Sequence, residues 1–290
     1  MKATNFFVFT WLSLLPVYAQ DSTTVINQKR LYTVLIAGGA GYTATLIGLN
    51  QLWYAQSERQ SFRFFNDNKE WKQVDKVGHF FAAFHFSSAT SATLQWSNIE
   101  KHKANLWGSV TGFLILLPIE ILDGFSADYG ASGGDLLANA AGSAFFLGQS
   151  LIWNEIRIQP KFSFQRTGYP ALRTDGTLGT GMPSEIIKDY NGQTYWLSVN
   201  LDKFLHFPKW LNLAFGYGAH EMVYARDHDN QAAGYNAFRQ YYVGLDFDLS
   251  HIRTKSKVFN TILFLVNMVR LPAPAFQFSK NGTSFRLFQF

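Results

Sequence analysis

The chain has 290 residues, of which 17% are aromatic and 16% charged, and its formal net charge is +5. Soluble domains carry about 25% charged residues, so this balance favours an envelope or membrane-embedded protein. The absence of cysteine excludes disulfides, thiolate metal sites and a cysteine nucleophile. The positive charge is dispersed, which argues against a nucleic-acid partner and suits contact with anionic membrane lipid.

The first residues predict export. Residues 1–19 combine Lys2, the apolar run FFVFTWLSLLPV and a small-residue exit that ends at Ala19. This pattern is typical of a cleaved signal peptide, because the apolar run is too short to span a membrane. We expect a mature chain that begins near Gln20 in the envelope of a Gram-negative bacterium, periplasmic or associated with the outer membrane. An uncleaved anchor is the alternative.

Residues 20–157 predict a four-helix hydrophobic module that could embed in a membrane. Apolar stretches cover residues 31–50, 77–96, 105–122 and 135–153. Each approaches the roughly 20 residues that a membrane-spanning helix needs. Small residues such as Gly142 and Gly148 recur in them and permit close helix packing.

Residues 158–290 change to short alternating runs, which predict a small antiparallel β region and make the fold class α+β. Residues 239–249 show the alternation, whereas residues 257–269 look helical. The pair Asn281-Gly282 between two such runs predicts a C-terminal hairpin with these residues at its turn. Five or six strands are credible, about two fewer than the smallest outer-membrane barrels use, so we prefer a sheet beside the helices.

Polar residues at helical spacing interrupt three of the apolar stretches. Ionisable groups in such surroundings are costly without partners, and antiparallel helices would bring these groups to one end of the bundle. Three are candidate acid and base groups: His79, Glu120 and Asp123. Five more form a candidate ligand-binding or structural cluster: Asp75, Lys76, Ser132, Asp135 and Asn139. A buried salt-bridge network is the non-catalytic alternative.

Other chemistry has little support in the sequence. One histidine among several carboxylates is a weak metal signal, so we predict no metal and no cofactor. His85, on the apolar part of its stretch, is expected to be a hydrogen-bonded core residue. The chain contains no nucleophile elbow, Walker loop or dinucleotide fingerprint.

Three motifs occur in order: D-K-x-G-H from Asp75, E-x-x-D-G from Glu120 and S-x-x-D-x-x-x-N-x-x-G from Ser132. Together they resemble the YfiM-like family of predicted periplasmic lipoproteins and, more distantly, the VanZ-like membrane proteins. The resemblance covers roughly residues 70–150 and implies an exported protein without an established activity. Because no cysteine follows the signal, the chain departs from the lipoprotein pattern and lacks the residue that would carry an N-terminal lipid.

We therefore expect an exported, membrane-associated envelope protein of uncharacterised activity, whose polar cluster is structural or ligand-binding. One alternative is a membrane-facing enzyme that acts on a lipid or cell-wall precursor. A second is a small outer-membrane β-barrel. Membrane lipid is the expected partner, and the sequence does not tell which protein partners the chain has.

Overall fold

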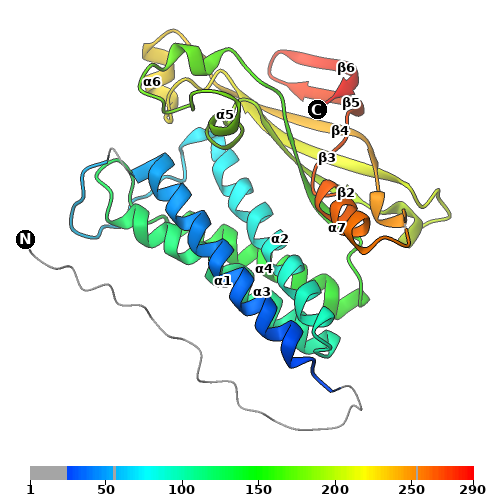
Figure 1. The fold of residues 1–290 in the computed structure, drawn as a ribbon. Helices are drawn as coiled ribbons and strands as arrows, with labels where there is room; N and C mark the ends of the chain where they lie inside the picture. The colour runs from blue at the N-terminus through cyan, green and yellow to red at the C-terminus, as the bar shows by residue number, and fades with distance from the viewer. Residues whose placement is uncertain (1–24, 55–56, 253) are drawn as a thin grey trace, which may run out of the picture.

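The computed structural model describes residues 25–54, 57–252 and 254–290. The predicted signal peptide and the predicted start near Gln20 lie outside the described residues. Within these ranges, a bundle of long helices lies on one side and an antiparallel sheet on the other (Figure 1). This arrangement confirms the α+β class.

All four predicted long helices are present. They are α1 (Gln28–Leu49), α2 (Val74–Trp96), α3 (Lys101–Gly124) and α4 (Gly133–Trp153). Helix α4 begins where the sequence indicates, because the side chain of Ser132 accepts a hydrogen bond from the backbone N–H of Asp135 at 3.1 Å. Helix α2 packs against both α3 and α4 and is the central helix of the bundle.

The sheet has six strands in the order β1-β2-β3-β4-β5-β6, and every neighbouring pair is antiparallel. The strands are β1 (Ile158–Phe164), β2 (Gln193–Val199), β3 (Leu211–His220), β4 (Phe238–Phe247), β5 (Ala273–Ser279) and β6 (Gly282–Gln289). The segment before β5 also pairs with β1, through hydrogen bonds from Phe162 N to Met268 O (2.9 Å) and from Arg270 N to Phe162 O (2.8 Å). The sheet therefore curls until its first strand meets the segment that leads into its fifth.

Three short helices accompany the sheet: α5 (Met182–Lys188), α6 (Asp227–Ala232) and α7 (Lys257–Val266). Helix α7 confirms the helical prediction for most of residues 257–269. The C-terminal hairpin is also confirmed, but its turn lies one residue earlier than predicted. Ser279 pairs with Gly282, so Lys280 and Asn281 form the turn, and Gly282 follows it with a φ of +111° that favours glycine.

Helix α2 joins the bundle to the sheet. The ring of Phe81 lies 5.7 Å from that of Tyr195 on β2, and Gly78 leaves room for the Tyr195 hydroxyl. Further along the helix, His85 is buried and its Nε2 lies 2.8 Å from the carbonyl oxygen of Pro160 on β1. This contact confirms the prediction that His85 is a hydrogen-bonded core residue.

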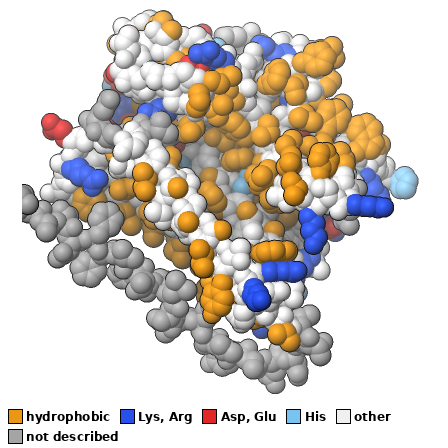
Figure 2. Space-filling model, in the orientation of Figure 1, with side chains coloured by type: hydrophobic (Ala, Val, Ile, Leu, Met, Phe, Trp, Pro, Cys, Tyr) orange, Lys and Arg blue, Asp and Glu red, His pale blue; other side chains and the backbone are white. Residues whose placement is uncertain are grey.

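The bundle buries many small polar side chains beside Phe84, Leu116 and Phe146, and it exposes other large apolar ones. Between α2 and α3, Ser91 donates a hydrogen bond to Asn105 at 2.6 Å; between α3 and α4, Ser109 donates to the backbone of Ser143 at 2.9 Å. On the outside of α4, Leu137 and Ile152 are 71% and 75% exposed. Hydrophobic side chains likewise gather on α1, which has no buried residue (Figure 2).

The sheet has the same inverted pattern. One row of paired residues on its outer face is apolar: Leu197, Phe215, Val243, Phe276 and Phe285. Phe276 and Phe285 in this row are 51% and 57% exposed. On the inner face, Lys161 and Asp246 form a fully buried ion pair at 2.7 Å. Both halves of the molecule therefore place many polar groups inside and many large apolar groups outside.

Glycines of α4 provide a test of the close packing in the bundle. A Cβ at Gly142 would overlap the carbonyl oxygen of Phe80 on α2, whereas a Cβ at Gly148 would meet nothing within 4 Å. We expect Gly142→Ala to lower the melting temperature of the purified protein in detergent, because α2 and α4 must separate. Gly148→Ala, in the same helix, should leave the melting temperature unchanged or raise it slightly, because alanine favours a helix over glycine by up to about 1 kcal/mol. Equal melting temperatures for the two variants would contradict this account.

Candidate functional site

The structure brings the predicted polar residues of α2, α3 and α4 together near one end of the bundle, in what we call the polar cluster. Lys76 on α2 lies at its centre. Its Nζ is 2.9 Å from Asp135 Oδ1 on α4 and 2.9 Å from Asp67 Oδ2 in the loop that precedes α2. Asp75 lies at 3.9 Å from the same ammonium group. One lysine thus faces three carboxylates.

Ser132 connects three segments at the start of α4. Besides capping the helix, its hydroxyl donates a hydrogen bond to Asp67 Oδ1 at 2.6 Å. Its backbone N–H donates to Glu120 Oε2 on α3 at 3.0 Å. The loop before α2, the end of α3 and the start of α4 are therefore held together at one serine.

His79 lies one turn further along α2. Its Nδ1 is 3.0 Å from Asn139 Oδ1 and 3.8 Å from Glu120 Oε1, while its Nε2 is 3.9 Å from Asp75 Oδ1. A proton on Nδ1 would let the ring donate to Asn139 and turn a free Nε2 toward Asp75. Glu120 Oε1 and Asn139 Nδ2 are buried and have no hydrogen-bond partner among the described residues.

Asp123 lies at the edge of the polar cluster. Its Oδ1 accepts a hydrogen bond from the hydroxyl of Tyr54 at 2.6 Å. Among the described residues, the carboxylates within 4.0 Å of the His79 ring nitrogens are those of Asp75 and Glu120. Of the three candidate acid and base groups, the geometry therefore brings His79 and Glu120 together. The catalytic role of all three stays a prediction.

Sequence reasoning missed three members of the site: Asp67, Tyr54 and Tyr190. Tyr190 follows α5 and donates a hydrogen bond to Asp75 Oδ1 at 2.7 Å, across 115 residues of chain. Asp67 stands outside the apolar stretches, so helical spacing carries no signal for it. The only indication in the sequence was its position shortly before the D-K-x-G-H motif.

The charge of Asp67 is stabilised by its neighbours. Burial alone would raise the pKa of this carboxyl, but hydrogen bonds from Ser132 and Lys76 outweigh burial and hold the pKa below its usual value. Asp67 is therefore ionised at neutral pH and pairs with the Lys76 ammonium. This pair is the clearest stabilising interaction in the polar cluster.

A divalent cation is a further possibility that the geometry raises. Ligand atoms of Asp75, His79 and Asp135 lie within 4.8 Å of one another. Lys76 already supplies a positive charge to Asp135 at this place, so the site is better suited to an ion pair than to a metal. The absence of a metal site stays a prediction.

The architecture is a helical bundle that contains a polar cluster. The bundle is joined to an antiparallel sheet whose outer face is largely apolar. Residues 63–148 match a family described as "Predicted periplasmic lipoprotein (DUF2279)". This match supports the predicted resemblance at the level of the family, and the matched segment contains every member of the polar cluster except Tyr54 and Tyr190. The resemblance to VanZ-like proteins stays a prediction. No curated protein and no solved structure matches the chain.

The Asp67–Lys76 pair predicts a pH-dependent effect of Asp67→Asn. At pH 7 the variant should lose roughly 1–3 kcal/mol of stability, because the Lys76 ammonium loses one of its two close partners. Since the pKa of Asp67 is lowered by folding, its contribution is present above its unfolded pKa of about 4 and is lost as the pH falls below that value. Thermal unfolding of the wild type and the variant in detergent should therefore converge in acid. A difference that persists unchanged at about pH 3 would contradict the assignment.

Proposed function

We propose that this protein is an integral membrane component of the cell envelope and that the polar cluster fastens its helices to one another. The family match, to predicted periplasmic lipoproteins, supports export to the envelope. The observation that carries the membrane proposal is the inverted distribution of polar and apolar side chains in both halves of the molecule.

In the part of the chain that the structure describes, three helices are long and apolar enough to cross a membrane by length and composition: α1, α3 and α4. Helix α1 has 22 residues, which at 1.5 Å per residue gives roughly 33 Å, close to the thickness of a hydrocarbon core. Hydrocarbon is the surrounding in which exposed leucine and isoleucine cost nothing and buried serine and asparagine contacts hold helices together. The apolar outer face of the sheet extends this surface.

The polar cluster supports a structural role because each of its segments contributes a partner. Lys76, Asp135 and Ser132 join α2 to α4, and Glu120 joins α3 to the same serine. In apolar surroundings, such contacts specify one register of the three helices. We infer that the polar cluster has a structural role and holds the three helices together.

The absence of cysteine makes lipid contact directly testable with single-cysteine variants. Leu151→Cys on α4 and Phe215→Cys on β3 lie at side chains that are 64% and 46% exposed. We expect a bimane label at either position to be quenched by nitroxide-bearing lipid when the protein is reconstituted in nanodiscs. Gln231→Cys, on the exposed face of α6, is the control that aqueous iodide should quench instead.

Each label tests a separate part of the proposal. Aqueous quenching at Leu151→Cys would overturn membrane insertion of the helices. Aqueous quenching at Phe215→Cys, with lipid quenching at Leu151→Cys, would place the sheet outside the membrane and restrict the proposal to the bundle.

A membrane-facing enzyme that acts on a lipid or cell-wall precursor is the second candidate. The observation that favours it is the buried Glu120 Oε1, which has no hydrogen-bond partner among the described residues and lies 3.8 Å from His79 Nδ1. A carboxyl and an imidazole at this separation could exchange a proton through a substrate.

Paired variants distinguish the structural role from the catalytic one. If the polar cluster is structural, Asp135→Asn should lower the melting temperature by several degrees. The ability of both Asp135→Asn and His79→Gln to complement a deletion strain should then follow their stability. If His79 is catalytic, His79→Gln should fold and melt like the wild type yet fail to complement. A stable Asp135→Asn variant would contradict the structural proposal.

A further inference from the structure

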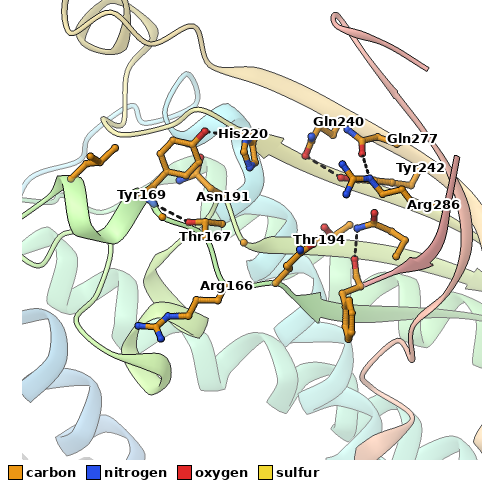
Figure 3. Close-up of a pocket in the computed structure, with 16 residues that line it drawn as sticks. Arg166, Thr167, Tyr169, Asn191, Thr194, His220, Gln240, Tyr242, Gln277 and Arg286 are labelled. Atoms are coloured by element: carbon orange, nitrogen blue, oxygen red, sulfur yellow. Dashed lines mark hydrogen bonds between the residues drawn. The ribbon is translucent and has the colours of Figure 1, made fainter. Parts of the chain in front are cut away.

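A second polar region lies on the inner face of the sheet, apart from the polar cluster. It is a cavity of about 480 Å³ between the strands and the loop that follows β1. Figure 3 shows Gln240, Tyr242, Gln277 and Arg286 together on one side, with Tyr169 and His220 on the other. A cavity of this size falls within the usual range of small-molecule sites.

The walls of the cavity combine amides, hydroxyls and cationic side chains with the apolar side chains of Leu172 and Phe290. None of its 16 lining residues is an aspartate or a glutamate. The hydroxyl of Tyr242 donates to Gln240 Oε1 at 3.0 Å, and Arg286 Nε donates to Gln277 Oε1 at 3.0 Å. These bonds orient both amides through their oxygens, and their NH2 groups, which have no hydrogen-bond partner among the described residues, can donate to a ligand.

The cavity also carries one uncompensated positive charge. Arg166 at its rim forms a bidentate ion pair with Glu185, at 2.6 and 2.8 Å. Arg286 has no carboxylate within ion-pair distance in the part of the chain that the structure describes, and Gln277 is its hydrogen-bond partner. The two terminal NH2 groups of its guanidinium, which carry four further N–H donors, can therefore hold an anion in a forked geometry.

We propose that this cavity binds a hydroxyl-rich anion, namely a sugar that carries a phosphate group, either free or as the head group of a lipid. Arg286 holds the phosphate, and the amides of Gln240 and Gln277 with the hydroxyl of Thr194 bind the sugar hydroxyls. Acceptor-rich ligands fit a wall that has no aspartate or glutamate side chain and offers amide, hydroxyl and guanidinium donors. The inference does not depend on the membrane proposal, since it rests on the inner face of the sheet alone.

Two variants of the cavity and one control test the site with glucose 6-phosphate as the free probe, measured by calorimetry. Arg286→Gln removes the anchoring charge, and Gln277→Glu places a carboxylate beside Arg286 that competes with the ligand. We expect each to weaken binding at least tenfold. Arg239→Gln removes the same charge from the outer face of β4, where Arg239 donates to Tyr217, and should bind within about twofold of the wild type.

Further probes identify the source and the chemistry of the ligand. Phosphatidylinositol 4-phosphate in nanodiscs tests a lipid head group: preference for it over glucose 6-phosphate would support the lipid-linked form, and the reverse would support the free sugar. Inorganic phosphate should bind more weakly than either. Equal affinity for inorganic phosphate, failure of both sugar phosphates to bind, or unchanged binding by Arg286→Gln and Gln277→Glu would overturn the proposal.

Discussion

The structure depends on the pairing of polar groups in an interior where buried polar side chains outnumber the large apolar ones. In a water-soluble domain the interior holds leucine and phenylalanine, and their burial supplies most of the favourable free energy. Here the bundle interior holds Ser91, Asn105 and Ser143, and the sheet interior holds Lys161 and Asp246. Partners stabilise such an interior, because an unpaired buried charge or amide is costly. Specific hydrogen bonds and close backbone packing therefore add to the burial of side chains such as Phe84, Phe146 and Trp196.

Helix α2 shows how far this constraint shapes the chain. It is as long as α3 and α4 but is not among the helices apolar enough to cross a membrane. The difference follows from its position, because one of its sides faces the two other helices and another faces β1 and β2. A helix enclosed in this way can carry Lys76 and His79, provided that the neighbouring elements supply acidic and amide partners. They do so at the polar cluster.

The sequence predicted the helices and strands of the fold better than it predicted which of their faces are covered and which distant residues contact each other. Length and apolarity were sufficient for the four long helices, and spacing was sufficient to place Lys76, Glu120 and Asp135 at one end of the bundle. Alternation in residues 239–249 separated two faces of a strand, but alternation does not tell which face is covered. The contact from Tyr190 to Asp75 could not be predicted, because it joins distant parts of the chain through packing rather than through a local period.

The position of β2 relates the two polar regions to each other. The family match ends at residue 148, before the sheet begins, so the polar cluster belongs to the matched segment and the cavity does not. Tyr195 on the outer face of β2 contacts Phe81 of α2, whereas its neighbour Thr194 lines the cavity on the inner face. A strand alternates its side chains, so adjacent residues can serve opposite faces without touching the same groups. The segment that leads into β2 is a second connection, because Tyr190 donates to Asp75 of the polar cluster and the next residue, Asn191, lines the cavity.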